Sequence, residues 1–119
     1  MYSKILKLTY TEAVKAFPQF ESVNSIRKVI TFKNDSSLST YSSKSDVIVY
    51  YDIVSDSAPL LLIERLKRSD VKLFSLNKAV KKLNKLLSDH VAVTRVSDDK
   101  MYVDIVVVKN NIYKSVTEE

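Results

Sequence analysis

The sequence predicts an α+β fold: a tandem βαββ(β) repeat with pseudo-two-fold symmetry, whose two helices pack on one face of antiparallel sheet. The chain has 119 residues, 45% of them hydrophobic, which suits a single domain over residues 1–119. TYTEAVKAFPQF at 9–20 aligns without gaps on SLNKAVKKLNKL at 75–86. YYDIV at 50–54 likewise resembles YVDIV at 102–106. Two such matches in the same order predict an internal repeat. The predicted copies comprise residues 3–66 and 70–116.

The first predicted copy begins with a strand over residues 3–8 and continues into a helix. Thr9 is the expected N-cap of this helix, because Glu12 follows three residues later and completes a capping box. Apolar residues recur at the i, i+3, i+4 and i+7 spacing of one buried stripe, and Pro18 helps to end the helix. β-Branched and aromatic residues then predict two strands, over residues 25–33 and 46–54.

The second predicted copy repeats this order of elements. A strand over residues 71–74 leads into a helix capped by Ser75. The segment between the copies has two interpretations. Pro59 suits the first turn of a helix, whereas the repeat predicts a strand over residues 60–66, which we adopt. The second copy ends with a hairpin and a last strand, over residues 91–96, 101–108 and 112–116.

The composition removes several classes of site. The chain has no glycine, which P-loops, Rossmann turns and nucleophile elbows need for positive φ or close backbone approach. It has no cysteine, which excludes disulfides and thiolate metal sites and favours a reducing, cytoplasmic compartment. No apolar run approaches the roughly 20 residues of a membrane-spanning helix. Because glycine is absent, Asn, Asp and Ser must form the turns. We expect these turns at residues 33–37, 68–70, 97–100 and 109–111.

The second predicted helix concentrates positive charge. Like charges at i, i+4 spacing cost roughly 0.2–0.5 kcal/mol for each pair. The aligned part of the first helix carries one lysine and one glutamate, so the charge belongs to one copy only. A solvated surface is compatible with this pattern, but the asymmetry favours contact with a polyanion. Four lysines fall within about 100° of helical arc, opposite the apolar stripe: Lys78, Lys81, Lys82 and Lys85.

Further basic residues extend the predicted nucleic-acid-binding set. The formal net charge is +5, which favours polyanionic partners. Arg27 and Lys28 lie on the predicted strand over residues 25–33. Lysine predominates over arginine, so we expect contacts to phosphates rather than to base edges. The full set is Lys78, Lys81, Lys82, Lys85, Arg27 and Lys28, with no catalytic residue, metal or cofactor.

The order of elements resembles a domain of the DNA sliding clamps. Tandem βαβββ units whose helices line one face would account for nearly the whole chain. The resemblance implies that the helices face duplex DNA and that the sheets form the outer rim and the subunit joints. The TATA-binding fold is a similar tandem repeat that contacts DNA through its sheet. The first helix departs from the clamp pattern because it is not basic, and a ring would need several copies of this chain.

A metal-dependent nuclease is a further hypothesis. Asp52 and Asp104 occupy matching places in the two copies, and paired carboxylates can hold Mg²⁺. Asp98 and Lys100 have the acid-x-lysine spacing of such enzymes but fall in a predicted turn. His90 is the one histidine of the sequence, which excludes paired-histidine metal motifs and suits a helix C-terminus instead. Enzymatic activity is therefore not the expectation.

Taken together, these features favour a small non-enzymatic nucleic-acid-binding protein of viral or mobile-element origin. It would contact duplex DNA phosphates through the lysine-rich helix. The alternative is a protein-interaction module, such as a host-enzyme inhibitor or an assembly subunit, that acts through edge strands and homo-oligomerisation. The apolar run VDIVVV at 103–108 supports this alternative, because a partner would cover one of its faces.

Overall fold

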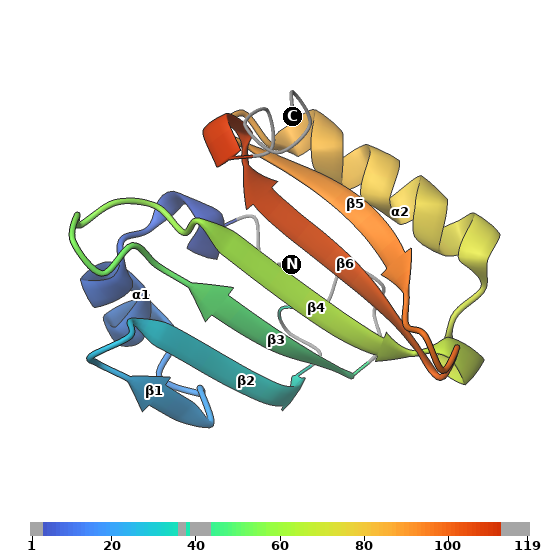
Figure 1. Ribbon diagram of the computed structural model, residues 1–119, viewed down its shortest axis with the longest axis horizontal. Helices are drawn as coiled ribbons and strands as arrows, with labels where there is room; N and C mark the ends of the chain where they lie inside the picture. The colour runs from blue at the N-terminus through green and yellow to red at the C-terminus, as the bar shows by residue number, and fades with distance from the viewer. Residues whose placement is uncertain (1–3, 36–37, 39–43, 113–119) are drawn as a thin grey trace.

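A computed structural model describes residues 4–35, 38 and 44–112, which form one antiparallel sheet backed by helices (Figure 1). The α+β class is therefore confirmed, and the sheet is single. Its strand order is β1-β2-β3-β4-β6-β5. The strands are β1 (Ser22–Asn24), β2 (Val29–Asp35), β3 (Ser45–Tyr50), β4 (Leu61–Lys67), β5 (His90–Val96) and β6 (Tyr102–Lys109). The helices are α1 (Tyr10–Ala16) and α2 (Leu73–Leu86), each preceded by a 3-10 helix, η1 (Ile5–Lys7) and η2 (Arg68–Asp70).

Both α-helices lie behind the same face of the sheet (Figure 1). Phe17, at the end of α1, meets Phe32 of β2 edge to face, with ring centroids 6.4 Å apart. At the other end of the sheet, α2 lies against β5. Full burial of a large apolar side chain contributes roughly 1.5–3 kcal/mol to the stability of the fold. The fully buried apolar residues of this covered face are Ile30, Phe32, Val47, Val49, Leu62, Leu66, Val103, Ile105 and Val107.

The opposite side, which we call the open face, has no helix over it among the described residues (Figure 1). Directly paired residues of antiparallel strands share a face, so the register arranges its side chains in rows. Two rows cross from β2 to β5, and their members are partly exposed and almost all apolar. The first row is Val29, Tyr50, Leu61, Val108 and Val91, and the second is Thr31, Ile48, Ile63, Val106 and Val93.

The N-terminus of α1 matches the prediction. Thr9 Oγ1 accepts a hydrogen bond from Glu12 N at 3.3 Å, and Thr9 N donates to Glu12 Oε1 at 3.0 Å. This reciprocal pair is the predicted capping box, and it satisfies two backbone donors that the helix itself cannot. The helix ends with Phe17 as its C-cap, immediately before Pro18.

Three of the described residues have a positive φ although none of them is glycine. They are Lys28, Asn34 and Lys100, with φ of 54°, 50° and 60°. Asn34 lies where the β2–β3 register shifts. The turn predicted at 33–37 is wrong at its start, because residues 33–35 belong to β2; residues 36–37 are outside the described residues. Lys100 closes the predicted turn between β5 and β6. Left-handed backbone at a lysine costs stability, so the hairpin pairing must hold these turns in place.

Several predicted strands are confirmed with small shifts of their ends. The hairpin over residues 91–96 and 101–108 is β5 and β6, and the strand chosen over residues 60–66 is β4. The strand predicted over residues 25–33 is only partly right. Residues 25–28 form a turn, in which Asn24 Oδ1 accepts hydrogen bonds from the backbone N–H groups of Ile26 and Arg27, and β2 begins at Val29.

Other predicted strands are wrong. Residues 5–7 form η1 rather than a strand, because Ile5 and Leu6 are adjacent and both buried, whereas a strand would send them to opposite faces. Residues 73–74 form the first turn of α2, since η2 already reverses the chain after β4. The last predicted strand, 112–116, is contradicted at its start by helical residues 110–112; its remainder is outside the described residues.

Candidate nucleic-acid interface

Helix α2 is fixed in rotation by an apolar stripe and one polar contact. Leu76, Val80 and Leu83 are buried at i, i+4 and i+7. The Asn84 side chain binds both backbone groups of Ala92 on β5: Nδ2 donates to the carbonyl at 2.9 Å, and Oδ1 accepts from the amide at 2.7 Å. These contacts turn the opposite side of α2 to solvent.

No helix of the described residues, α2 included, is long and apolar enough to cross a membrane.

The solvent side of α2 carries the predicted lysines, which we call the lysine face. Lys78, Lys81, Lys82 and Lys85 are all exposed. The helix contains no acidic residue, and no carboxylate of residues 4–35, 38 or 44–112 lies within 4.0 Å of these amines. Their mutual repulsion is therefore not relieved by ion pairs within the described part of the chain.

Phe74 belongs to the same surface and was not predicted. Its ring is 73% exposed, and Lys78 Nζ lies 4.9 Å from the ring centroid, within the range of a cation–π contact. The signal was present in the sequence, because Phe74 precedes Lys78 by four residues, one helical turn. It was missed because residues 71–74 were assigned to a strand. An exposed ring beside amines can stack on a nucleic-acid base.

A groove of about 730 Å³ separates α2 from the edge strand β5. Apolar side chains from both elements contribute to its walls, and two amines of the lysine face lie along it. The groove therefore combines an apolar surface with positive charge. Its lining residues are Phe74, Asn77, Lys78, Val80, Lys81, Val93 and Thr94.

Arg27 and Lys28 are not brought to the lysine face. They lie in the turn between β1 and β2, where Lys28 holds a positive φ. Strand β1 is one edge of the sheet, whereas α2 packs beside β5, the other edge (Figure 1). The six predicted residues thus divide into a cluster of four on α2 and a distant pair.

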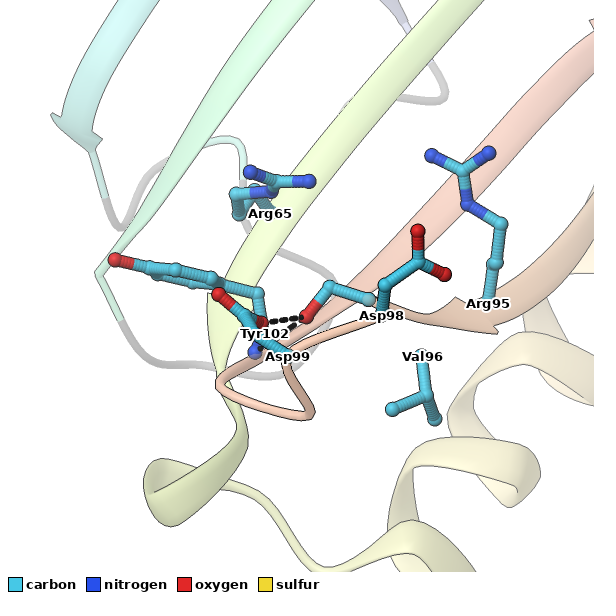
Figure 2. A pocket seen from close by; sticks show the side chains of 7 residues that line it. Arg65, Arg95, Val96, Asp98, Asp99 and Tyr102 are labelled. Atoms are coloured by element: carbon cyan, nitrogen blue, oxygen red, sulfur yellow. Dashed lines mark hydrogen bonds between the residues drawn. The ribbon is translucent and has the colours of Figure 1, made fainter.

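The open face carries a charged row beside its two apolar rows, and Figure 2 shows two members of the charged row, Arg65 and Arg95. Asp104 of β6 is 1% exposed. Arg65 donates two hydrogen bonds to its carboxylate, from Nε to Oδ1 at 2.8 Å and from Nη2 to Oδ2 at 3.0 Å. Arg95 reaches the same carboxylate at 3.5 Å, and the Arg65 guanidinium lies 5.0 Å from the Tyr102 ring centroid. Hydrogen bonding to Asp104 raises the pKa of Arg65. Both guanidiniums are therefore already engaged within the chain.

A cavity of about 390 Å³ opens beside this row, at the β5–β6 turn (Figure 2). Asp99 organises the turn, because its Oδ1 accepts hydrogen bonds from Ser97 Oγ at 2.6 Å and from Met101 N at 2.9 Å. These bonds lower the pKa of Asp99. Acidic and basic side chains both line the cavity, so it has no clear preference for an anion or a cation.

The carboxylate pair expected of a nuclease is not formed. Asp52 lies beyond the end of β3, where its Oδ1 accepts a hydrogen bond from Val54 N at 2.8 Å. That bond lowers the pKa of Asp52. Asp104 lies inside β6, in the row that contains Asp46 at the other end of β3. No group of three or more His, Asp or Glu in the described residues is arranged to hold a metal ion.

The prediction that His90 lies at a helix C-terminus is wrong. Helix α2 ends at Leu86, and His90 is the first residue of β5. Its side chain is 6% exposed, with Nε2 2.7 Å from the Pro59 carbonyl oxygen. The histidine therefore joins the start of β5 to the segment that precedes β4.

The lysine face is the strongest concentration of one charge on a regular element of the described chain. A rigid helix holds its four amines within one arc, and the Phe74 ring extends the surface. Such an arrangement can bind a polyanion with few geometric demands, because an ammonium acts as a point charge. Comparisons with protein-family models, curated proteins and solved structures found no match.

Proposed function

We propose that the protein binds nucleic acid, preferentially duplex DNA, through phosphate contacts of the lysine face. The observation that carries this proposal is the set of four exposed amines on α2 with no carboxylate near them in the described residues. Like-charge neighbours on a helix cost stability, and phosphates would relieve that repulsion on binding. The exposed Phe74 ring adds a surface for an unpaired base.

The expected binding mode has little sequence specificity. Base recognition in the major groove relies chiefly on bidentate arginine, asparagine or glutamine, whereas lysine ammonium groups contact phosphates from many directions. Of the arginines near the sheet, Arg65 and Arg95 are already bound to Asp104. Affinity should therefore depend mainly on salt concentration and on the number of amines engaged.

The order of elements supports a tandem repeat and a clamp-like arrangement as part of the same proposal. A 3-10 helix, an α-helix and antiparallel strands occur in this order twice, from η1 to β4 and from η2 to β6. Both α-helices cover one face of the sheet (Figure 1). In the sliding clamps that this order resembles, the helical face meets duplex DNA, which agrees with a role for the lysine face.

Fluorescence anisotropy with a labelled DNA duplex tests the proposal. Lys81→Glu combined with Lys82→Glu should weaken binding at low salt by at least about tenfold, because two attractive charges become repulsive. The matched control is Lys15→Glu combined with Lys33→Glu, which makes the same change of net charge at exposed sites on α1 and β2, away from α2. Equal loss in both variants, or no binding by the wild type, would reject the lysine face as the site.

The β5 edge supports a second candidate function, the binding of an extended acidic peptide. Ala92 points its N–H and C=O away from β6 toward Asn84. Backbone direction alternates along an antiparallel strand, so Thr94 and Val96 present theirs to the same free edge. The neighbouring groove offers apolar walls and the amines of Lys78 and Lys81. A peptide strand added here would pair its backbone with β5 and place acidic side chains near the lysines.

A proline substitution separates this second candidate from the first. Thr94→Pro removes an outward N–H while leaving the β5–β6 ladder and every lysine intact. It should abolish binding of a labelled peptide of alternating valine and glutamate and should spare DNA binding, whereas Thr94→Ala should spare both. Peptide binding that survives Thr94→Pro would contradict pairing at the β5 edge.

A further inference from the structure

The open face exposes more apolar surface than a solvated sheet face ordinarily does. Antiparallel sheets with one covered face usually alternate apolar residues inward with polar residues outward. In the middle of this face, Ile48, Ile63, Val106 and Val93 instead lie side by side across β3, β4, β6 and β5. A contiguous apolar patch of this kind marks a surface that another molecule covers.

The charged row next to these residues has a regular order of signs. Across the same four strands it reads Asp46, Arg65, Asp104 and Arg95, so acid and base alternate from β3 to β5. Reversing the order of this row gives base, acid, base and acid. The row is therefore complementary to its own reverse.

We propose that a second copy of this chain packs on the open face, sheet against sheet, about a two-fold axis that runs parallel to the strands. Such an axis keeps each row at its own height along the strands and reverses its order across them. Asp46 then faces Arg95 of the other copy, and the central aliphatic row faces itself in reverse. The arrangement is isologous, as closed dimers require, and sheet twist turns it into an aligned packing near −30°.

The size of the overlapping face is consistent with a small interface. The axis pairs β3 with β5 and β4 with β6 of the other copy, so four strands overlap. Four strands spaced about 4.8 Å apart and three rows spaced about 6.8 Å apart give a projected area on the order of 400 Å² for each copy. Two copies would bury on the order of 800 Å² of projected area, and the accessible area is larger because side chains protrude from the sheet, which places the dimer at the low end of specific interfaces. The dimer rests on the open face alone and does not depend on the nucleic-acid proposal. It would direct the two lysine faces outward on opposite sides, because α2 covers the other face of each sheet.

Sedimentation velocity at micromolar concentration gives the first test. The wild type should sediment as a dimer of the 13.6 kDa chain, and Ile63→Lys should sediment as a monomer. Ile26→Lys is the matched control, since Ile26 is 87% exposed in the β1–β2 turn, and it should remain a dimer. If circular dichroism shows that Ile63→Lys is unfolded, Val93→Lys replaces it, because Val93 is 37% exposed at the sheet edge. A monomeric wild type, or a dimer that survives both substitutions on the open face, would overturn the proposal.

A charge exchange tests the orientation of the two copies. Arg95→Asp and Asp46→Arg should each weaken dimerisation by about tenfold or more, because each places like charges opposite one another. The double variant should recover most of that loss. Strands β3 and β5 are three strand spacings apart, ~14 Å, so positions 46 and 95 cannot compensate each other within one chain. Each substitution also disturbs its own neighbours, so the coupling between the two positions is the readout. Strictly additive losses would overturn the two-fold arrangement.

Discussion

The two α-helices cover the same face of one sheet, yet their outer sides differ. Each buries an apolar stripe, α1 around Ala13 and α2 around Leu76, Val80 and Leu83. The outer side of α1 mixes Glu12 with Lys15, whereas that of α2 carries four lysines and no acid. Packing determines which side of a helix is buried and leaves the outer side nearly unconstrained. The positive charge of α2 is therefore not required by its packing on the sheet.

The largest expected effect concerns the buried side of α2. Leu83 is fully buried, so Leu83→Ala should lower the free energy of unfolding by roughly 2–5 kcal/mol. Leu86→Ala on the same helix is the control: Leu86 is 58% exposed and should cost well under half of that. Urea denaturation followed by circular dichroism measures both. Equal losses would mean that α2 does not pack on the stripe described above.

Removing the cap of α1 should have the next largest effect. Thr9→Ala deletes the side-chain acceptor for Glu12 N and should cost about 1 kcal/mol. Thr9→Ser keeps the oxygen and should cost much less, and Thr11→Ala in the first turn serves as the control for side-chain truncation. Helix α2 has no side-chain hydrogen bond at its N-cap, so it should be insensitive to the corresponding test. The same denaturation measurement applies.

The capping box also predicts a pH dependence that is specific to α1. Hydrogen bonds from the Thr9 backbone and side chain lower the pKa of Glu12. A depressed carboxyl pKa means stabilisation that is present above the unfolded-state pKa and is lost as pH falls through the folded-state value. Thermal unfolding should therefore show a gap between wild type and Glu12→Gln that is largest at neutral pH and closes in acid. A gap that is constant with pH would show that Glu12 acts without its charge.

The smallest expected effect has opposite signs in the two helices. Lys82→Gln relieves the repulsion with Lys78 and should raise stability by roughly 0.2–0.5 kcal/mol. Lys15→Gln removes a cation from the last turn of α1 and should lower stability slightly. Differential scanning calorimetry at low salt resolves such differences. A loss of stability in both variants would mean that the lysine face is not under electrostatic strain.

Local patterns predicted the elements whose formation depends on short-range chemistry. The spacing of Thr9 and Glu12 was enough to predict the capping box. Two apolar segments on either side of a polar turn were enough to predict the β5–β6 hairpin. Helical periodicity alone was enough to predict that the four lysines share one side of α2. Each of these features depends on residues within a few positions of one another, so sequence spacing was enough to find it.

The features that the sequence did not reveal depend on long-range packing. Ile5 and Leu6 look like strand residues, but both are buried in a 3-10 turn. Asp52 and Asp104 share a local motif, yet the chain leaves β3 after Tyr50, so only Asp104 lies inside a strand. The apolar rows of the open face become visible only when the register brings separate strands together.

The salt dependence of duplex DNA binding tests the central claim most directly. Each phosphate contact contributes about −0.9 to the slope of log affinity against log salt, so four amines predict a slope of roughly −3.6. Lys81→Gln combined with Lys82→Gln should reduce the magnitude of that slope to roughly 1.8, by removing two contacts without reversing charge. A slope that is the same in both proteins, or a wild-type slope near zero, would contradict the assignment of the lysine face as the phosphate-contacting surface.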